Sequence, residues 1–411
     1  MKNKKMIAVL LSAAMLVISL SGCGSTENTQ TGTAESTTDA AESTANTTET
    51  EPAEAAEAST QETAQSAPAE EISYDDLVSA AKEEGSLVFY GANSYLQDAA
   101  DNFAAEFGIK VEFTQLGETE MIEKVSAECK SGAVNADLVC AQDTYRVAAE
   151  LVNTGYAMNW SNARVGEILG DNDCTMMTWY YDTKSFMYND ELAGEKWLTN
   201  LWRITDPEYK GLFTMKDPAS EGVNYDMLTM LTSEPYASAL ADSYKEYYGK
   251  DIELTTENAG WEFIKMLFEN GVILTTSDST CATTVGALGQ ADTWIGYFST
   301  QRYSTQEEKG IQLSYDYAAC APVAGYAYPV YSIVLNGCKH PNAAKLFSEW
   351  LLSENGWAAF NDYYGGFSAN PNNVHATDYS FDDIKQYIVM DDADYLVERR
   401  ADMEDFIETL R

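Results

Sequence analysis

The chain has 411 residues and a formal net charge of -40, because 65 acidic residues outnumber 25 basic ones. Phosphate backbones repel a chain this acidic, which argues against nucleic-acid binding. The sequence contains two histidines, which excludes zinc sites built from several histidines and leaves few ways to build a histidine-dependent nucleophile. The apolar fraction of 45% is enough for a large core.

The first residues have the features of an export signal. Lysines within the first five residues precede an apolar stretch from Met6 to Leu20, which is shorter than the roughly 20 residues of a typical membrane-spanning helix. Leu20-Ser-Gly-Cys23 follows and resembles a bacterial lipobox, in which cleavage precedes the cysteine and lipid is attached to its sulfur. We therefore predict a signal peptide over residues 1–22 and an exported protein that a lipid on Cys23 anchors to the outer face of the cytoplasmic membrane. An ordinary signal peptide with an incidental cysteine is the alternative.

Residues 24–71 are expected to form a tether. They contain no aromatic residue, no Leu, Ile, Val or Met, and no Lys or Arg. Such a segment cannot bury enough apolar area to offset the entropy of ordering it. Residues 23–71 are therefore predicted to be a lipidated, disordered acidic tether that holds the folded body away from the membrane.

Cysteine pairing is left open by the sequence. The cysteines after Cys23 are Cys129, Cys140, Cys174, Cys281, Cys320 and Cys338. Export and an even number permit disulfides, but no pair has CxxC spacing. Buried free thiols fit the pattern at least as well, so no bridge is assigned.

From residue 72 the chain begins with alternating helices and strands. Ser73 can cap a helix that Gly85 ends, and Asp76 stands where it would complete a capping box. The pattern then predicts strands over residues 87–90, 109–116 and 136–140, separated by helices over residues 95–107 and 118–131. This βαβαβ order indicates a parallel sheet with right-handed crossovers.

Ligands of such sheets bind at the carboxyl ends of the strands, here residues 91–95, 117–120 and 141–144. A second α/β section follows an extended, aromatic-rich run over residues 176–189. Its predicted elements are strands over 212–216, 294–298 and 328–336, helices over 258–270 and 341–353, and a turn over 217–222 that leads into a helix.

Several stretches carry a family resemblance when they are taken together and in order. They are LVFYG at 87–91, EFGIKVE at 106–112, NADLV at 135–139, FMYND at 186–190, KDPASEG at 216–222, TVGALG at 284–289, HPNAAKLF at 340–347 and LLSENG at 351–356. Over residues 72 to about 371 the chain resembles the extracellular solute-binding lipoproteins of bacterial ABC transporters. The match is to class II, the group that includes iron(III)-, thiamine-, polyamine- and phosphonate-binding members.

The resemblance implies an α/β, two-lobe periplasmic-binding-protein type II fold, with two mixed sheets flanked by helices and joined by two hinge segments. Lobe 1 would span residues 72–180, lobe 2 residues 181–325, and residues 326–411 would return to lobe 1 and add C-terminal helices. The hinges are expected near residues 180–188 and 323–331. The resemblance also implies a monomer that closes on a small-molecule solute and delivers it to ABC permease transmembrane subunits, with no enzymatic activity and no cofactor.

One departure from the iron-binding members concerns tyrosines. Those members carry an adjacent tyrosine pair after the strand that corresponds to residues 294–298, whereas this chain has Gly296-Tyr-Phe-Ser-Thr300, in which Phe298 cannot bind a metal. Other adjacent pairs occur at residues 180–181, 247–248 and 363–364, but neighbouring side chains in a strand point to opposite faces. We therefore predict no metal site and keep ferric iron binding as an alternative.

Polar residues in the predicted cleft segments are the candidate solute ligands. In the first section they are Asn93, Ser94, Tyr95, Glu118, Thr119, Gln142 and Asp143, and in the second Ser220, Glu221, Gly222 and Ser279. Aromatic candidates that could stack on a planar or sugar-like solute are Trp179, Tyr181 and Tyr297. The alternatives are helix capping for Asn93 or Ser94, a favourable interaction with the helix dipole for Glu118, and core packing for the aromatic residues.

The charge of these segments favours a cation. They are rich in acids and contain no arginine, and Lys216 and Arg146 flank them. An organic cation would suit carboxylates and aromatic faces, whereas a phosphonate or sulfate would require arginine or several free N–H groups. We therefore expect a cationic or neutral polar solute, thiamine-like or polyamine-like. An extracellular glycoside hydrolase with a pair of carboxylates is the alternative of another class, and import and sensing are both left open.

Overall fold

The computed structural model describes residues 72–194, 196–377 and 379–411. The predicted signal peptide, the lipidation of Cys23 and the tether lie outside these residues.

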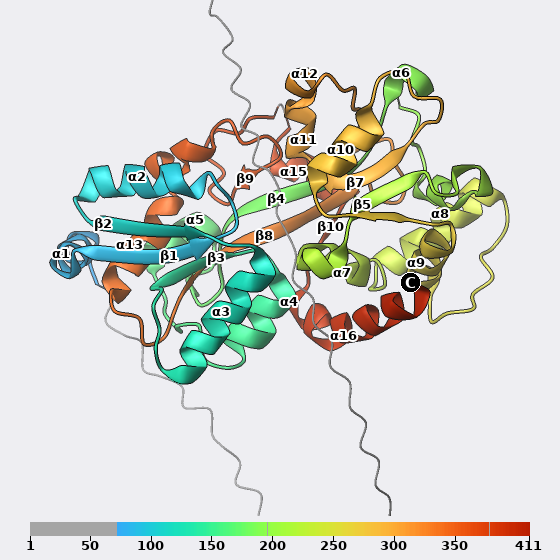
Figure 1. The fold of residues 1–411 in the computed structure, drawn as a ribbon. Helices are drawn as coiled ribbons and strands as arrows, with labels where there is room; N and C mark the ends of the chain where they lie inside the picture. The colour runs from blue at the N-terminus through green and yellow to red at the C-terminus, as the bar shows by residue number, and fades with distance from the viewer. Residues whose placement is uncertain (1–71, 195, 378) are drawn as a thin grey trace, which may run out of the picture. The chain divides into compact units, whose positions relative to one another are not determined.

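Three parallel strands build the first half of the sheet. β1 (Ser86–Gly91) lies between β2 (Lys110–Gln115) and β3 (Leu138–Ala141) and pairs in parallel with both. The crossovers are α2 (Leu96–Phe107) and α3 (Glu118–Ser131). The predicted βαβαβ order is confirmed, and the carboxyl ends of the three strands point toward the middle of the molecule (Figure 1).

Helix α1 (Tyr74–Glu84) precedes this unit. The Oγ of Ser73 accepts a hydrogen bond from the N–H of Asp76 at 3.2 Å, and Gly85, at a φ of 69°, ends the helix. The predicted cap at Ser73 is therefore confirmed, but Asp76 accepts from the Oγ of Ser73 at 2.7 Å, and no bond from the backbone N–H of Ser73 completes the capping box among the described residues. Leu77 and Ala81 face the core, and α1 packs against α13 (Pro341–Leu351).

Two long strands connect the halves of the sheet. β4 (Met177–Tyr188) pairs with β8 (Gly325–Val334) in antiparallel orientation along most of its length. β8 also pairs with β3 at one end, and β4 pairs with β7 (Ile295–Ser299) at the other. The two predicted sheets therefore join into one ladder, in the order β2-β1-β3-β8-β4-β7-β5-β6. β8 begins three residues earlier than predicted.

The second half of the sheet continues from β7. β5 (Phe213–Lys216) pairs in parallel with β7 and with β6 (Ile273–Thr275). Its helices are α7 (Gly222–Met230), α8 (Tyr236–Tyr248), α9 (Ala259–Glu269) and α10 (Asp278–Gly286). Figure 1 shows two lobes as the resemblance predicts, and we use lobe 1 for the side of β1–β3 and lobe 2 for the side of β5–β7.

The remaining elements are short, apart from the last helix. They are α4 (Thr144–Arg146), α5 (Ala163–Leu169), α6 (Asp190–Ala193), α11 (Gln301–Ser304), α12 (Gln306–Lys309), α14 (Glu354–Trp357), α15 (Phe381–Ile384), α16 (Ala393–Leu410), β9 (Phe367–Ser368) and β10 (Ile388–Met390). A π-helical turn covers Val147–Val152, and 3₁₀ turns cover Leu201–Thr205, Pro207–Tyr209, Pro218–Ser220, Ala358–Phe360 and Lys385–Tyr387.

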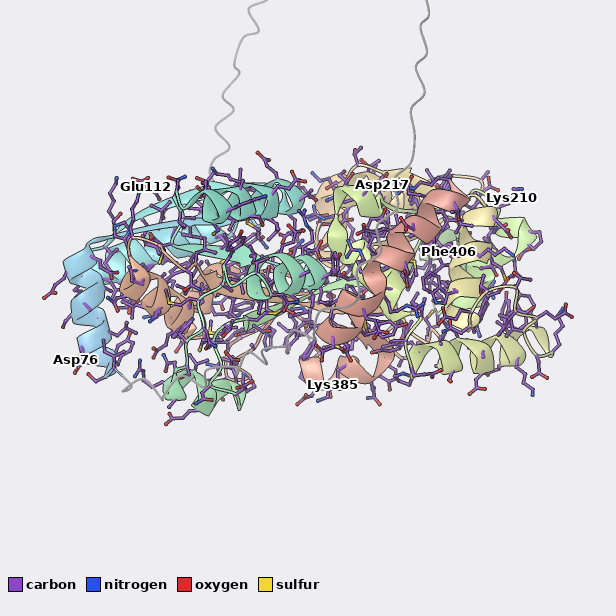
Figure 2. The ribbon with its side chains drawn as sticks, turned by 90° about the horizontal axis from the view of Figure 1, so that it is seen from below. Asp76, Glu112, Lys210, Asp217, Lys385 and Phe406 are labelled. Atoms are coloured by element: carbon purple, nitrogen blue, oxygen red, sulfur yellow. The ribbon has the colours of Figure 1, made fainter. Side chains whose placement is uncertain are left out.

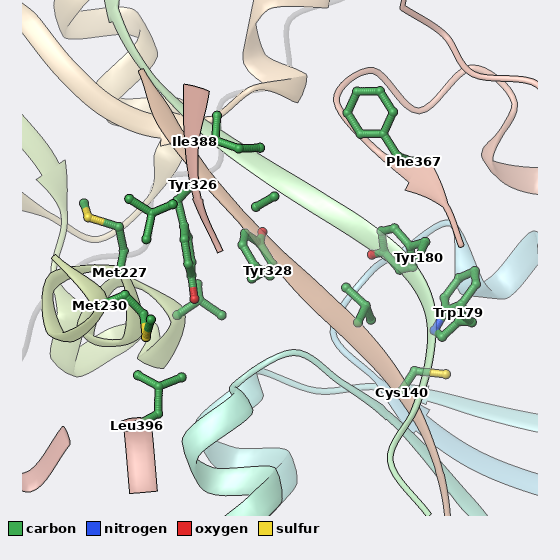
Figure 3. Packing of buried hydrophobic residues seen from close by; sticks show 14 of the residues in the cluster. Cys140, Trp179, Tyr180, Met227, Met230, Tyr326, Tyr328, Phe367, Ile388 and Leu396 are labelled. Carbon is green, nitrogen blue, oxygen red and sulfur yellow. The ribbon is translucent and has the colours of Figure 1, made fainter. Parts of the chain in front are cut away.

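Aromatic residues of β4 and β8 fill the core where the lobes join (Figure 3). Trp179 is fully buried, and its ring packs edge-on against Tyr180 and Phe360. Every residue of β8 is buried, including Tyr326 and Tyr328. Strands covered on both faces read as continuous apolar or aromatic runs rather than alternating ones, which explains the composition of residues 176–189.

The C-terminal helix α16 contacts both lobes. It packs against α7 and α9 of lobe 2 and against α4 of lobe 1. Figure 2 shows it, with Phe406 labelled, crossing the underside of lobe 2. Its Arg400 is 2% exposed and forms ion pairs with Asp226 of α7 and, at 3.7 Å, with Asp143.

Among the described residues, no helix is both long enough and apolar enough to span a membrane. The six cysteines of this part of the chain are free thiols, and Cys140, Cys174, Cys281 and Cys320 are buried.

Candidate functional site

A pocket of about 460 Å³ lies between the lobes, at the carboxyl ends of the strands. We call it the interlobe pocket. Lobe 1 contributes Ala92, Asn93, Ser94, Tyr95, Gln115, Leu116, Gly117, Glu118 and Gln142. Lobe 2 contributes Lys216, Ser220, Glu221, Asp278, Ser299, Gln301 and Arg302, and the rest of the lining is Asp182 of β4, Tyr328 of β8 and Tyr363. The parallel-sheet rule applied to the sequence is therefore confirmed by the position of the pocket.

Arg302 is a cation that faces this pocket without a counter-ion. Its Nη1 donates to the Oγ of Ser279 at 3.2 Å, and its Nη2 donates to the side-chain oxygen of Gln301. Its Nε is buried and has no hydrogen-bond partner. Within residues 72–411, apart from positions 195 and 378, no carboxylate lies within ion-pair distance of this guanidinium. A buried donor without an acceptor is costly, so the group is suited to binding an external acceptor.

The acids of lobe 2 are already neutralised by lysines. Lys184 of β4 is fully buried and forms ion pairs with Glu221 and, at 3.4 Å, with Asp278. Lys216 lies 3.2 Å from the other oxygen of Glu221. Burial alone would raise the pKa of Glu221, but Lys184 and Lys216 bring it below its ordinary value. The two carboxylates therefore add little net negative charge to the pocket.

Asp182 forms a second polar centre at the junction of β4 and β8. Its Oδ2 accepts hydrogen bonds from the hydroxyls of Tyr363 at 2.8 Å and Tyr328 at 3.1 Å, and its Oδ1 accepts the N–H of Thr183 at 2.8 Å. Burial raises the pKa of Asp182 to about 6, although these donors lower it. Burial, followed by the charge of Asp182, also raises the pKa of both phenols well above the ordinary value. The centre therefore holds one carboxylate and two protonated phenols at neutral pH.

Glu118 is the acid that lobe 1 contributes. Its Oε1 accepts the N–H groups of Gln142 at 2.9 Å and Asp143 at 3.3 Å. Burial raises its pKa to about 8, so the side chain is mostly neutral at pH 7. Glu118 is therefore mostly uncharged, whereas Glu221 is ionised but paired with Lys184 and Lys216, so neither presents the unbalanced negative charge that the sequence suggested.

Half of the fourteen predicted ligand positions line the interlobe pocket. They are Asn93, Ser94, Tyr95, Glu118, Gln142, Ser220 and Glu221. The side-chain oxygen of Asn93 accepts the N–H of Tyr95 at 3.0 Å, which orders the turn before α2; the N-cap of α2 is Tyr95 and has no side-chain capping bond, so neither Asn93 nor Ser94 is the cap. Contact of these residues with a solute stays a prediction.

The predicted aromatic ligands lie elsewhere. Trp179 is in the core, and Tyr297 is fully buried beneath Lys184, whose Nζ lies 6.0 Å from the ring centroid. Tyr181 faces away from Asp182, because successive residues of a strand alternate, and stacks on Phe381 at a ring distance of 4.4 Å. It lines a second pocket instead. Core packing is therefore correct for Trp179 and Tyr297.

The other predicted ligands lie beside the pocket but do not line it. Asp143 is buried against Arg400, and Gly222 packs directly on Asp143. The carbonyl of Thr119 accepts a bond from Arg146 at 3.3 Å, and Ser279 accepts from Arg302. These four residues hold neighbouring elements in place.

Sequence reasoning missed Arg302, Gln301, Asp182, Tyr328 and Tyr363. Arg302 follows the carboxyl end of β7, a parallel partner of β5. Ligands of parallel sheets bind at the carboxyl ends of the strands, and applying this rule to β7 would have predicted Arg302 as a pocket residue. The tyrosines and Asp182 lie within or beside buried strands, where sequence gives no sign of which side chains reach the pocket. In the described part of the chain, no group of three or more His, Cys, Asp or Glu side chains could hold a metal ion.

Comparison with known proteins adds a family and a fold. Residues 98–384 match the family described as bacterial extracellular solute-binding protein. No curated protein sequence matches the chain.

Three solved structures show the same fold. Iron-bound HitA from Pseudomonas aeruginosa is 16% identical with a TM-score of 0.60, and the alignment covers 79% of this chain and 99% of that one. The ferric binding protein from Campylobacter jejuni is 16% identical with a TM-score of 0.61, at 79% and 99% coverage. AfuA from Actinobacillus pleuropneumoniae, with fructose-6-phosphate bound, is 19% identical with a TM-score of 0.57, at 79% and 96% coverage. The predicted two-lobe type II fold is thereby confirmed.

Proposed function

The chain belongs to the bacterial extracellular solute-binding proteins, and we propose that its interlobe pocket captures a small solute carrying a carboxylate or phosphate group. Such proteins serve ABC importers, and the permease transmembrane subunits would receive the solute. The family and its structural neighbours are binding proteins rather than enzymes.

The observation that carries this proposal is that the guanidinium of Arg302 lines the pocket without a carboxylate partner among the described residues, and that its Nε has no acceptor. Arginine presents a planar set of donors that matches a carboxylate or phosphate, and hydrogen bonds to charged groups contribute about 1.5–3 kcal/mol. Lys216 stands in the same lining, while Lys184 holds Glu221 and Asp278. The proposal therefore replaces the cationic solute that the sequence favoured, since that expectation depended on the absence of arginine from the cleft.

Thermal-shift and calorimetric titrations test the proposal. Fructose 6-phosphate, citrate and sulfate are the anionic probes, and thiamine and spermidine are the cationic ones. We expect stabilisation by at least one anion, growing as ln(1 + [L]/Kd), and a loss of about 10- to 100-fold in affinity in Arg302→Ala. Lys309→Ala removes an exposed charge from α12 and serves as the control. Binding of a cation alone, or anion binding unaffected in Arg302→Ala, would contradict the proposal.

Ferric iron is the second candidate, supported by the convergence of Asp182, Tyr328 and Tyr363. Carboxylate and phenolate oxygens suit a hard cation, although both phenols would have to lose their protons. Titration with ferric citrate should then produce a visible phenolate-to-iron absorption that Tyr363→Phe weakens. Anion binding by the iron-free protein would instead favour the first candidate.

A hydrolase of the carboxylate-pair type receives no support from the pocket. Such an enzyme needs one free acid and one free base, whereas Lys184 pairs with both Glu221 and Asp278. The other two lining acids are held as well: Asp182 accepts from Tyr328, Tyr363 and Thr183, and Glu118 accepts from two backbone N–H groups. We also propose that the protein is a monomer.

Solute binding should close the two lobes by bending β4 and β8 at the predicted hinges near residues 180–188 and 323–331. This closure should lower the radius of gyration measured by solution scattering. A scattering profile that does not change at saturating solute would contradict these hinges.

Anchoring through Cys23 belongs to the same proposal, supported by the lipobox-like Leu20-Ser-Gly-Cys23. Cys23→Ser should appear in the medium or remain unprocessed, as membrane fractionation and mass spectrometry of the N-terminus would report. Normal processing and normal membrane retention of this variant would remove the anchor from the proposal.

A further inference from the structure

The carboxyl group of Glu118 is fixed in the wall of the interlobe pocket. Glu118 begins α3, directly after β2, and is 6% exposed. Its Oε1 accepts two backbone N–H groups, those of Gln142 and Asp143. These bonds tie the carboxyl ends of β2 and β3 together and commit one oxygen of the carboxyl group to accepting.

The other oxygen of the Glu118 carboxyl group, Oε2, lacks a partner. It is buried and has no hydrogen-bond partner among the residues that the structure describes. An unpartnered buried polar atom costs about 1–3 kcal/mol, so a partner is expected, and Glu118 lines the pocket where a solute would lie. Because peptide N–H groups donate to Oε1, a proton on this carboxyl group must be carried by Oε2.

The groups around Glu118 favour its protonated form. Burial raises the pKa of Glu118 to about 8, and Asp143 acts in the same direction, while the two N–H groups and Arg146 of α4 oppose them. Cys140 of β3 and Tyr180 of β4 also face this group, and burial raises the pKa of each. The other charged and titratable groups of the lining are Tyr95, Asp182, Lys216, Glu221, Asp278, Arg302, Tyr328 and Tyr363. No cation forms an ion pair with Glu118 in the described segments.

We propose that Glu118 binds the solute as a neutral acid, donating its Oε2–H to an anionic oxygen of the solute, so that capture is coupled to retention of one proton. This inference rests on the proposed function, because its acceptor belongs to the anion that Arg302 binds. An ionised Glu118 would place a carboxylate beside that anion without a proton between them. Affinity should therefore be constant at low pH and fall, toward tenfold per pH unit, above the pKa of Glu118.

Calorimetry with fructose 6-phosphate and with sulfate between pH 7 and 9 tests the coupling. The phosphate monoester loses its second proton near pH 6 and sulfate does not titrate, so neither probe changes its charge much in this range. We expect the wild-type protein to lose about tenfold in affinity across the range and to take up a proton on binding at pH 8.5. Proton uptake is read from the heats in two buffers with different ionisation enthalpies.

Two variants distinguish the effect of the titrating proton of Glu118 from the effect of its hydrogen bond to the solute. Glu118→Gln keeps an acceptor for the two N–H groups and supplies a donor that does not titrate, so the affinity that this variant retains should not change between pH 7 and 9. Glu120→Gln alters an exposed acid two residues along α3 and should retain the wild-type pH profile.

The outcomes distinguish this inference from the proposed function. Arg302-dependent binding with a flat pH profile in wild-type protein, or a profile unchanged in Glu118→Gln, would overturn the role of Glu118 and leave the proposed function intact. Failure of fructose 6-phosphate, sulfate and citrate alike to bind at pH 7, or anion binding independent of Arg302, would overturn the proposed function and this inference together.

Discussion

A methyl group added to Gly222 would overlap the carboxylate of Asp143 and come within 3.3 Å of the Nη2 of Arg400. Gly222 begins α7 in lobe 2, and Asp143 follows β3 in lobe 1. The lobes therefore touch behind the interlobe pocket at a point with no room for a side chain. Each residue is next to one that lines the pocket, Glu221 and Gln142.

Gly222→Ala should therefore destabilise the protein. Asp143 cannot move freely, because its Oδ1 caps α4 by accepting the N–H of Arg146 and because Arg400 lies against it. Overpacking of this kind typically costs about 1–3 kcal/mol, measurable as the free energy of unfolding in urea. Gly117→Ala is the matched control, since nothing lies within 4 Å of the added methyl group. Equal stability of the two variants would show that the lobes can separate here without cost.

Arg400→Met should be more damaging. The guanidinium is buried and forms ion pairs with Asp226 and Asp143. Removing one partner of a buried ion pair typically costs about 3–5 kcal/mol, because the remaining charge is left unpaired. Chemical denaturation should show this loss, and a second change, Asp226→Asn, should recover part of it.

The neighbouring Arg399 provides the control for Arg400. It pairs at the surface with Glu257 and Asp402, both largely exposed, and exposed pairs contribute about 1 kcal/mol or less. Arg399→Met should accordingly change the free energy of unfolding only slightly. Comparable losses in the two variants would mean that α16 contributes through packing rather than through the buried charge.

Glu221→Gln tests the ion-paired cluster of Lys184, Glu221 and Asp278. The change leaves the buried ammonium of Lys184 with Asp278 as its remaining carboxylate. We expect a fall of a few kcal/mol in the free energy of unfolding and no selective loss of affinity for cations. A variant of normal stability that specifically loses thiamine or spermidine binding would restore the cationic solute that the sequence favoured.

Stability should fall as the pH rises through neutrality. Burial raises the pKa of Asp391 to about 7, although Thr144, at 2.5 Å, and Tyr326 donate to its carboxylate. A group with a raised pKa in the folded state binds more protons there than in the unfolded chain. Its stabilisation is therefore complete below about pH 4 and lost as pH rises through 7, with a slope of up to about 1.4 kcal/mol per pH unit.

Asp391→Asn should flatten this dependence between pH 5 and 8, as urea denaturation at several pH values would report. Glu118 contributes in the same direction up to about pH 8, so some slope remains in the variant. Asp98→Asn, at an exposed position of α2, should reproduce the wild-type profile. A wild-type stability that rises over this interval would contradict the assignment.

Local sequence patterns determined most of lobe 1 and the location of the pocket. The cap at Ser73, the glycine at residue 85 and the alternation of apolar runs are properties of neighbouring residues, so they could be read without the fold. The carboxyl ends of parallel strands must meet at one edge of a sheet, and for this reason Asn93, Glu118 and Gln142 were placed correctly. The order of the quoted stretches also sufficed to predict the two-lobe fold.

The tertiary structure alone decided the charge of the site. Lys184, Glu221 and Asp278 come from β4, the β5–α7 turn and α10, and Arg400 reaches Asp143 and Asp226 from the last helix. Coulomb energy depends on distance and burial rather than on composition. A sequence with a net charge of -40 can therefore fold around a pocket in which lysines pair with the acids of lobe 2, two phenols donate to Asp182, and the guanidinium of Arg302 has no carboxylate partner among the described residues.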